Sequence, residues 1–528
     1  MDGGGTAGFG LSFGGRMGDG DREWIPDEFE ESMPPSIEEL TDAAPRTTDS
    51  ANADAIVVEH GAGYRYVLEW SSWIAWSGQR WEMQGARGKV LRAAMLTARL
   101  EHFRTTGRIT KLESELAEAN EAEDPRAKSI EARIKWEQRL LKWHEQSQNN
   151  SRLEAAAKIL ETRLVISKAD LDRDPWLFNV ANGTIDLRTG DIRSHDRADF
   201  ITQMSDIEYD REAKAPTWEA FISTAMRGSL LMRLYLQRLV GYTLTGTTTE
   251  HVLVFHYGNT GSNGKSTFLT ALRTLMGDYG CAAPRSLLFE PKNGAEPHPT
   301  ELARLYGKRL ATCSEVPENV ELAEAKVKDL TGGDVLSVRR MSENFWDMTP
   351  THTLHAAGNH KPIIKGTDGG IWRRIKLVPW LNKVAEEDKD HDLGLKLAAE
   401  RSGILAWAVR GCLEWQRTGL AEPAEVTEAG VEYRSESDVL GAFFESQCVF
   451  EDGARFSCKY LRKAYETWCE DMGHRSVGAR ILGRRLRERG VTDITVRVDG
   501  RPAQGWSGVR LKTNLEAAGL EDPHAIAN

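Results

Sequence analysis

The stretch that decides the fold reads His256-Tyr257-Gly258-Asn259-Thr260-Gly261-Ser262-Asn263-Gly264-Lys265-Ser266-Thr267. An apolar segment, residues 252–255, precedes it, and a helical pattern over residues 268–276 follows it. Glycines allow backbone N–H groups to turn toward phosphate oxygens, and the start of a helix adds a partial positive charge. A strand, a glycine-rich turn, Gly-Lys-Ser and a helix together predict a phosphate-binding P-loop.

The P-loop pattern gives its last residues a chemical role. Lys265 is expected to reach the β- and γ-phosphates of ATP, and the Ser266 hydroxyl is expected to hold Mg²⁺. The strict pattern has its first glycine at position 259, which is Asn259 here, so Gly258 lies one position early. The alternative is an ordinary glycine-rich turn. The predicted nucleotide contacts are Gly258, Asn259, Thr260, Gly261, Ser262, Asn263, Gly264, Lys265, Ser266 and Thr267.

The composition is that of a globular protein without a membrane segment. The chain has 528 residues and a net charge of −11, and this length predicts more than one domain. No apolar run approaches the ~20 residues that a membrane span needs, and the N-terminus lacks a basic-then-apolar signal pattern. Cys458, Cys469 and His474 lack an evident fourth zinc ligand, so the six cysteines are expected to be buried free thiols. We therefore expect a cytoplasmic protein that has no membrane partner.

Shifts in composition divide the chain into six segments. Residues 1 to 55 are Gly-rich and then acidic, without periodic apolar positions, which predicts a disordered tail. The segments are this tail (1–55), an α+β N-terminal domain (56–215), an α/β P-loop ATPase domain (216–385), a helical segment (386–430), a winged-helix-like domain (431–512) and a C-terminal tail (513–528).

The N-terminal domain is expected to combine strands and helices. Residues 64–81 predict short strands, whose tryptophans either stack on bases or, as is more usual for such aromatics, fill a hairpin core. Residues 89–165 carry charged and apolar positions at helical spacing, and Glu123-Asp124-Pro125 interrupts them, which indicates a helical hairpin with a solvated charged face. Asn182-Gly183 and Thr189-Gly190-Asp191 predict tight turns between short strands.

A carboxylate follows the P-loop where metal-assisted hydrolysis needs one. Residues 308–314 predict a short buried strand that ends at Glu315. We expect Glu315 to lie beside Mg²⁺ and to polarise the attacking water, with Glu318 as the second candidate. The alternative is a carboxylate at a strand end that is merely solvated.

Three more polar groups follow in chain order. A strand over residues 353–357 ends just before Asn359, which is expected to sense the γ-phosphate or to position the water. Arg373 and Arg374 precede another strand, residues 375–379. One of these two arginines is expected to act as a finger that neutralises charge on the neighbouring subunit's nucleotide.

The C-terminal region is basic within an acidic chain. Residues 476–512 contain nine Lys or Arg and three Asp or Glu, so 9 − 3 = +6, and the rest of the chain carries −17. A helix is expected to turn Ile481, Leu482 and Leu486 inward, and to place the predicted DNA contacts on its outer face: Arg480, Arg484 and Arg487. Strands at 494–498 and 508–512 complete a winged-helix pattern. The alternative is an arginine face that docks a protein.

The order of these motifs resembles the superfamily 3 helicases, in the phage/plasmid primase-associated, poxvirus-type branch. The similarity covers about residues 60–512 and depends most on Lys265, Glu315, Thr331-Gly332-Gly333-Asp334, Asn359 and the pair Arg373-Arg374. The run from Pro175 to Gly190 is also similar to the domain that precedes the helicase in that branch. The resemblance implies an AAA+-type core, a ring that is usually a hexamer, and ATP-driven translocation on single-stranded DNA, commonly 3′ to 5′.

In such proteins a β-hairpin before the Asn sensor grips DNA in the central channel. Here it corresponds to about residues 338–348, with Ser342-Glu343-Asn344 at its tip. Because that tip lacks the basic or His residue that is frequent in the family, we expect Arg339 and Arg340 to make the contact. The alternative for these two arginines is ion pairing within the hairpin stem.

The resemblance implies a replicative helicase of a phage or mobile element that acts on single-stranded and forked DNA; for a phage protein, it would work in the bacterial cytoplasm. Relatives often carry a primase-polymerase domain; none is expected in this chain, so a separate primase or polymerase is an expected partner. The alternative function is a DNA-stimulated ATPase that loads or remodels a replication complex without unwinding. A small-molecule kinase and a binding module with a vestigial ATPase fit these motifs less well.

Overall fold

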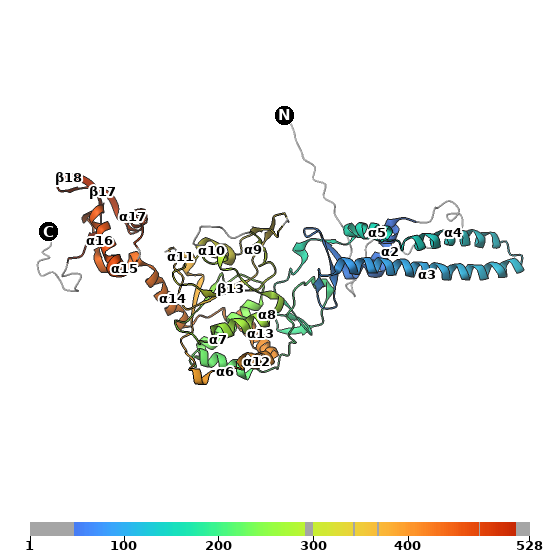
Figure 1. The fold of residues 1–528 in the computed structure, drawn as a ribbon, viewed down its shortest axis with the longest axis horizontal. Coiled ribbons are helices and arrows are strands. Elements are labelled where there is room, and N and C mark those ends of the chain that lie inside the picture. Colours follow the sequence, from blue (N-terminus) through green and yellow to red (C-terminus); the bar gives the residue numbers. More distant parts are fainter. Residues whose placement is uncertain (1–46, 291–298, 342–343, 367–368, 475, 514–528) are drawn as a thin grey trace, which may run out of the picture. The chain divides into compact units, whose positions relative to one another are not determined.

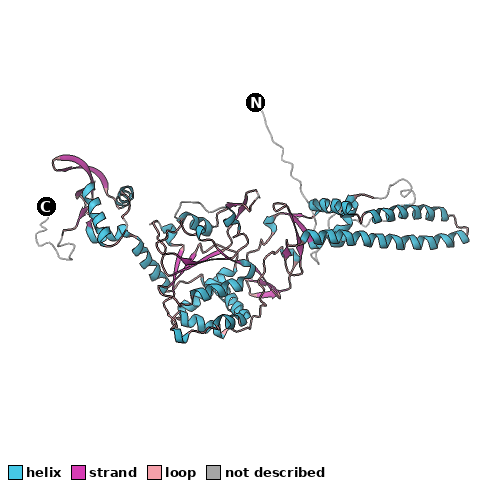
Figure 2. Cartoon of the chain, viewed as in Figure 1, coloured by secondary structure: helices cyan, strands magenta, loops and turns pink. Residues whose placement is uncertain are grey.

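The computed structural model describes residues 47–290, 299–341, 344–366, 369–474 and 476–513. The chain divides into two compact units: unit 1 comprises the described residues up to Ser77 together with Glu82–Asp170, and unit 2 comprises Gly78–Trp81 and the chain from Leu171 onward. No helix of the described residues is long and apolar enough to cross a membrane. Figures 1 and 2 show the elements of both units.

Unit 1 is a helical assembly on a small sheet. Its elements are α2 (Asp49–His60), η1 (Gly61–Gly63), β1 (Tyr64–Val67), β2 (Ser72–Trp76), β3 (Trp81–Glu82, at the unit boundary), α3 (Ala86–Glu121), α4 (Ala127–Gln146), α5 (Asn150–Arg163), β4 (Val165–Ile166) and η2 (Lys168–Asp170). Strand β1 pairs antiparallel with β2 and parallel with β4. Helices α2, α3 and α5 enclose a core that includes Trp73, whose side chain is buried. A core role therefore holds for this tryptophan.

Two local signals set the helix boundaries of unit 1. The Thr48 side chain accepts a hydrogen bond from the Ala51 N–H, so α2 begins at Asp49, inside the tail predicted for residues 1–55. The rest of that tail, residues 1–46, lies outside the described residues. The predicted break between α3 and α4 is confirmed: Glu123 takes a left-handed φ of 51° and Asp124 accepts a hydrogen bond from the Arg126 N–H.

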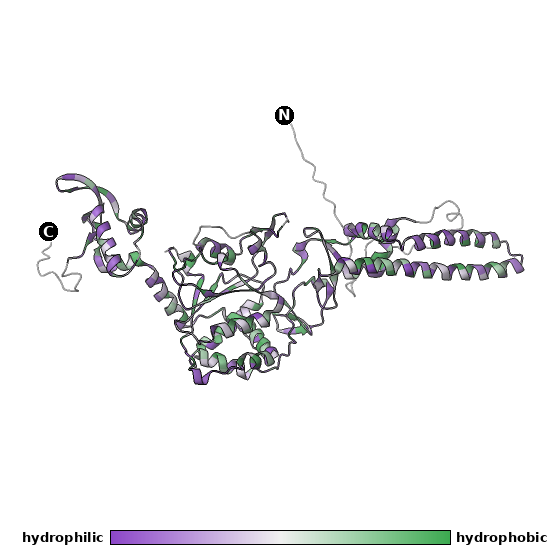
Figure 3. Ribbon diagram, in the orientation of Figure 1, coloured by the Kyte–Doolittle hydropathy of each residue, from purple (hydrophilic) through white to green (hydrophobic). Residues whose placement is uncertain are grey.

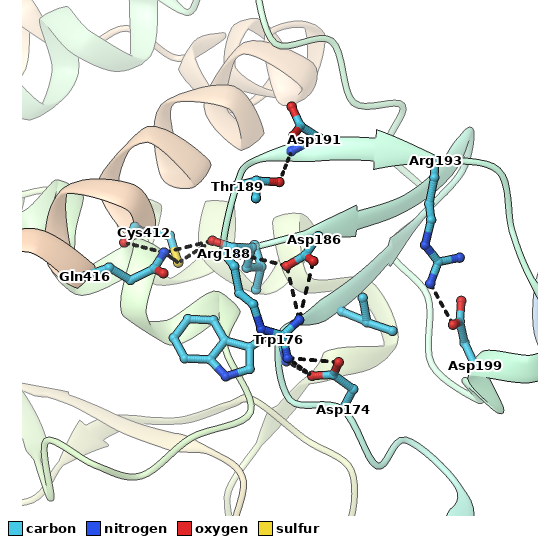
Figure 4. Close-up of polar contacts among 12 residues, drawn as sticks. Asp174, Trp176, Asp186, Arg188, Thr189, Asp191, Arg193, Asp199, Cys412 and Gln416 are labelled. Atoms are coloured by element: carbon cyan, nitrogen blue, oxygen red, sulfur yellow. Dashed lines mark hydrogen bonds and ion pairs between the residues drawn. The ribbon is translucent and has the colours of Figure 1, made fainter.

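Unit 2 begins with an antiparallel meander and a helical pair. Its first elements are β5 (Leu177–Val180), β6 (Gly183–Asp186), β7 (Asp191–Arg193), η3 (Arg197–Asp199), α6 (Pro216–Ala225) and α7 (Leu230–Leu244). The turns between β5, β6 and β7 lie where the sequence predicted them. The Arg188 guanidinium bonds the carboxylates of Asp174 and Asp186 and lies over the Trp176 ring, which ties down the meander (Figure 4).

The meander belongs to unit 2, whereas the sequence predicts residues 171–215 to lie in the N-terminal domain. The physical reason is packing: Phe178 and Ile185 are fully buried in one core with α7 and α13 (Arg401–Thr418). In addition, the Gln416 amide on α13 donates to the Leu187 carbonyl (Figure 4). The contacts therefore separate the chain at Asp170, earlier than the predicted boundary at 215.

A five-stranded parallel sheet forms the centre of unit 2, in the order β14-β8-β13-β10-β9. Its elements and those around it are β8 (Leu253–Tyr257), α8 (Lys265–Met276), η4 (Gly277–Tyr279), β9 (Gly280–Ala282), η5 (Arg285–Leu287), α9 (Pro299–Ala303), β10 (Leu310–Val316), α10 (Glu324–Gly332), β11 (Leu336–Val338), β12 (Trp346–Met348), β13 (Thr353–Gly358), α11 (Gly369–Trp372), β14 (Ile375–Pro379), η6 (Glu386–Asp388), α12 (Leu393–Ala399), α13 and α14 (Ala424–Ser437). The expected α/β class is confirmed. Because every strand is parallel, the segments after β8, β10 and β13 emerge at one edge of the sheet.

The C-terminal segment has a hydrophobic cluster of its own, with Phe443, Tyr465 and Leu486 buried. Its elements are α15 (Val439–Gln447), β15 (Cys448–Val449), β16 (Arg455–Ser457), α16 (Cys458–Asp471), α17 (Ala479–Glu488), β17 (Thr492–Val498), β18 (Arg501–Ser507) and β19 (Arg510–Leu511). The three helices are confirmed, and β16, β18 and β17 form one antiparallel sheet. Residues 514–528, most of the predicted C-terminal tail, lie outside the described residues.

The predicted position of the second hairpin strand, residues 508–512, was wrong. The turn is only Asp499-Gly500, both with positive φ (49° and 77°), so the returning strand starts at Arg501. Pro502 is tolerated in β18 because β16 pairs only with residues 505–507 of that strand, so among the described residues no strand pairs with the other side of Pro502.

Candidate nucleotide-binding site

The loop between β8 and α8 is built around two glycines. Helix α8 begins at Lys265 directly after Gly264, whose φ of 89° is left-handed. A Cβ atom on Gly264 would lie 2.8 Å from the Phe221 ring, and one on Gly258 would lie 2.6 Å from the Trp380 carbonyl oxygen. Both positions therefore require glycine, which accounts for Gly258 standing one residue early in the pattern.

Lys265 points its amine into the loop that it follows. Its Nζ donates to the Gly258 carbonyl (3.0 Å), to Oδ1 of Asn263 (3.3 Å) and to Oδ1 of Asn359 (3.0 Å). The side chain is buried, and burial lowers the pKa of Lys265. The structure thus brings together two predicted site residues, Lys265 at the start of α8, which follows β8, and Asn359 at the end of the adjacent β13.

Glu315 lies at the same edge of the sheet, but its carboxylate contacts Arg285 and not the P-loop. The pairing of β10 with β13 shifts register between Cys313 and Val316, and Glu315 takes a left-handed φ of 60° within that irregularity. Its exposed carboxylate forms an ion pair with Arg285 (3.1 Å) and, among the described residues, makes no hydrogen bond to the P-loop. A bulge of this kind re-aims a side chain, and such features occur next to active sites. Glu318 is exposed as well.

The two predicted finger arginines have different surroundings. Arg374 donates from Nε to Oγ1 of Thr331 (3.1 Å) and from Nη1 to the Gly370 carbonyl (2.7 Å). Thr331 opens the Thr-Gly-Gly-Asp segment at the end of α10. The Arg373 side chain is exposed and has no hydrogen-bond or ion-pair partner among the described residues. The Arg374 side chain is therefore held by contacts within its own chain, and the Arg373 side chain is not held by any described residue.

The predicted hairpin exists as β11 and β12, which pair antiparallel. Arg339 and Arg340 follow β11 directly and are half-buried; the Arg339 guanidinium lies over the Phe345 ring at 4.8 Å. Residues 342–343 of the predicted tip lie outside the described residues. Phe345 and Met341, beside the tip, are exposed apolar side chains.

On α17 the three predicted DNA contacts differ in their partners. Arg480 is exposed, and Arg484 lies 3.9 Å from Glu488. Arg487 forms two hydrogen bonds with Asp493 (2.7 and 3.0 Å) and covers the Trp506 ring. The prediction that Ile481 faces inward was wrong: its side chain is 42% exposed, because Leu482 and Leu486 alone fill the short helix's contact with the core.

The structure contains a buried histidine pair that the sequence did not predict. His256 Nε2 lies 3.0 Å from His355 Nδ1, Trp380 Nε1 donates to His256 Nδ1 (3.0 Å), and His355 Nε2 lies 3.2 Å from Oγ1 of Thr243. That hydroxyl donates to the Leu239 carbonyl, so it accepts from His355, and His256 in turn donates to His355. Burial lowers the pKa of His355 to about 3 and that of His256 well below its usual value, so both rings are neutral. The chain of bonds links β8, which leads into the P-loop, to β13, which leads to Asn359.

The site residues fit ATP and Mg²⁺. Gly261 leaves open space beside the loop backbone, since nothing lies within 4 Å of the place where its Cβ would be, and the Lys265 amine is already surrounded by oxygen acceptors. Mg²⁺ prefers oxygen ligands and takes only one or two from protein when phosphates supply the others. The Ser266 hydroxyl, exposed in the first turn of α8, and the Glu315 carboxylate could make that contribution.

Three family models match the chain, each over less than half of its length. "D5 N terminal like" matches residues 53–227, a family of unknown function (DUF5906) matches residues 256–374, and "Poxvirus D5 protein-like" matches residues 435–489. The second match runs from His256 at the P-loop to Arg374. The first extends across the boundary between units 1 and 2.

Curated viral proteins are similar to the chain at low identity. "Putative helicase L207/L206" of Acanthamoeba polyphaga mimivirus is 26% identical over 307 residues, which is 54% of this chain and 32% of that protein. "Putative helicase 022R" of Frog virus 3 is 25% identical over 52% of this chain and 30% of that protein. "Putative primase C962R" of African swine fever virus is 24% identical over 39% of this chain and 22% of that protein. The chain thus spans about a third or less of the length of these relatives.

Among solved structures, the C-terminal region of NrS-1 is similar, with 12% identity, a TM-score of 0.37, and coverage of 57% of this chain and 79% of that one. The D5-like matches at both ends of the described region and the viral relatives together support a relationship to the D5-type superfamily 3 helicases and primases.

Proposed function

We propose that this chain is an ATP-dependent DNA helicase of the superfamily 3 type. It translocates on single-stranded DNA as a ring of subunits, a hexamer as is usual in that superfamily. The observation that carries the proposal is the meeting of Lys265 and Asn359 at the carboxyl edge of a parallel sheet. A P-loop lysine beside a polar residue from the next strand is what coupling nucleotide binding to a motion requires. The strand order, with β13 between β8 and β10, supports an AAA+-type core.

In this account each site residue has one role. Lys265 exchanges its present oxygen partners for the β- and γ-phosphates, and Ser266 holds Mg²⁺, which neutralises phosphate charge when it is bound. Asn359, freed from Lys265, then bonds the γ-phosphate and reports its presence to β13. Glu315 leaves Arg285 and orients the attacking water. Arg373, rather than Arg374, reaches the neighbouring subunit's nucleotide, because Arg374 is held by Thr331 and Gly370.

The proposed DNA contacts lie outside the nucleotide site. Arg339 and Arg340 on the β11–β12 hairpin face DNA in the channel, and Arg480 and Arg484 on α17 hold a phosphate backbone. The order α15, β16, α16, α17, β17, β18 supports a winged-helix-like domain for this second role. A separate primase or polymerase is the proposed partner, and the relatives named as primases motivate it.

Strand displacement tests the proposal. Purified chain, ATP and Mg²⁺ are incubated with a forked duplex that carries a labelled strand, beside the Lys265→Ala variant. Release of the strand by the wild type alone is expected. ATP hydrolysis without strand release would contradict unwinding and favour an ATPase that loads or remodels a replication complex.

A further inference from the structure

Helix α4 carries a row of basic side chains on its outward face. Lys128, Lys135, Arg139 and Lys142 are all exposed and are separated by seven, four and three residues. Those separations return to the same face of an α-helix. We call these four residues the basic stripe.

The stripe is held straight by the packing behind it. Ile134, Glu137, Leu140 and Trp143 are the buried residues of α4, and α4 runs beside α3 along the hairpin (Figure 1). Nε of Arg108 on α3 donates to both carboxylate oxygens of Glu137 (3.0 Å each). At a rise of about 1.5 Å per residue, the stripe is about 21 Å long. Hydrophilic residues recur along both helices of the hairpin (Figure 3).

The cations of the stripe have no ion-pair partner among the described residues. Some other cations of unit 1 are paired: Arg87 with Glu154, Arg104 with Glu59, and Lys158 with Glu161. Glu131 is the acidic residue on the stripe's face, between Lys128 and Lys135. Like charges three and four residues apart destabilise a helix. Helix stability therefore gives no reason for Arg139 to stand between Lys135 and Lys142.

We infer that the basic stripe of α4 binds the phosphate backbone of duplex DNA. A straight, stiff row of cations suits a stiff polyanion, and about 21 Å spans about six base pairs at ~3.4 Å each. Single-strand sites use exposed aromatic residues for base stacking, and over its fully described length α4 has no exposed aromatic residue. The choice of DNA as the polyanion depends on the proposed function, but the stripe itself does not.

The test measures affinity of the full chain for a labelled 20-base-pair duplex, about three times the stripe's reach, by fluorescence anisotropy over a range of salt concentrations. The stripe variant is Lys128→Gln, Lys135→Gln, Arg139→Gln and Lys142→Gln. The matched control removes four paired cations of unit 1, with the same change in net charge: Arg87→Gln, Arg104→Gln, Lys111→Gln and Lys158→Gln.

For the stripe variant we expect an affinity on the order of tenfold lower and a log–log salt slope shallower by about 3.6, since each of the four phosphate contacts contributes about 0.9 to that slope. The control should bind as the wild type does. An unchanged slope, or an equal loss in the control, overturns the inference. Binding of poly-glutamate is measured in the same way. If the stripe variant loses poly-glutamate binding but keeps duplex binding, the inference is overturned and an acidic protein segment is the occupant. ATP hydrolysis without DNA, measured on the same samples, reports the P-loop separately, so failure of the proposed ATPase is distinguishable.

Discussion

The Nζ atom of Lys265 lies 3.0 Å from Oδ1 of Asn359, although 94 residues separate them in the chain. One follows β8 and the other follows β13, and these strands are neighbours in the parallel sheet. The contact places the amine that would hold a terminal phosphate against the amide that would sense it.

Asn359→Ala should therefore separate binding from hydrolysis. The variant keeps Lys265 and the loop backbone, so ATP affinity should change by only a fewfold, whereas turnover should fall by about 10²-fold because a fixed dipole beside the developing charge is lost. Equilibrium binding of a fluorescent ATP analogue and steady-state hydrolysis measure the two quantities. A loss of ATP affinity with unchanged turnover at saturating ATP would show that Asn359 acts only in binding.

The two arginines before β14 should give different defects. Arg373→Ala should lower turnover by about 10³-fold with no change in melting temperature, since its side chain is exposed. Arg374→Ala should lower the melting temperature, because it removes the bonds to Thr331 and Gly370.

Mixing provides the check on action between subunits. Arg373→Ala and Lys265→Ala are each expected to be inactive alone, but a mixed ring contains interfaces with an intact lysine and an intact arginine. Hydrolysis should therefore reappear on mixing. A mixture that stays inactive would contradict a role for Arg373 on a neighbouring subunit.

The buried histidines predict a stability that falls with acid. The pKa of His355 is about 3 in the folded chain, against 6.5 when exposed, because burial disfavours the charged ring. The unfolded chain therefore binds the proton first, and the free energy of unfolding falls as pH drops below about 6.5. Between about pH 7.5 and about pH 5.5, the free energy of unfolding should fall by about 1.4 kcal/mol less in His355→Gln than in the wild type. Urea denaturation at the two pH values measures this difference. Parallel losses in the two proteins would show that His355 is protonated or exposed in the fold.

The arginines of α17 should also separate. Arg480→Ala and Arg484→Ala should each weaken DNA binding similarly for all sequences and reduce the log–log salt slope by about 1. Arg487→Ala should mainly reduce thermal stability, because its guanidinium is already bonded to Asp493. Anisotropy titrations with forked DNA and thermal melts measure both effects. A larger binding loss for Arg487→Ala than for Arg480→Ala would show that the ion pair with Asp493 opens on DNA.

Local sequence predicted the parts of the site that depend on one segment. The loop glycines, Lys265 and the start of α8 lie within one run, and the parallel sheet follows from strands that alternate with helices. Asn359 could be placed beside Lys265 because the carboxyl ends of parallel strands meet at one edge.

Features that depend on tertiary packing could not be predicted in this way. His256 and His355 are 99 residues apart, and neither strand marks its histidine as a partner. Arg285, which holds Glu315, stands in no recognisable motif. The meander of β5 to β7 was predicted to belong to the N-terminal domain, whereas its packing against α13 places it in unit 2. Ile481 followed the apolar period of α17, yet the core beneath that helix is too small to cover it.

The most direct measurement is ATP hydrolysis with and without single-stranded DNA for the wild type, Lys265→Ala and Lys376→Ala. Lys376 is the matched control, a half-buried lysine on β14 that pairs with Glu422. We predict DNA-stimulated hydrolysis in the wild type and in Lys376→Ala, and none in Lys265→Ala. Hydrolysis that persists in Lys265→Ala, or its absence in the wild type, would contradict a P-loop ATPase at this site.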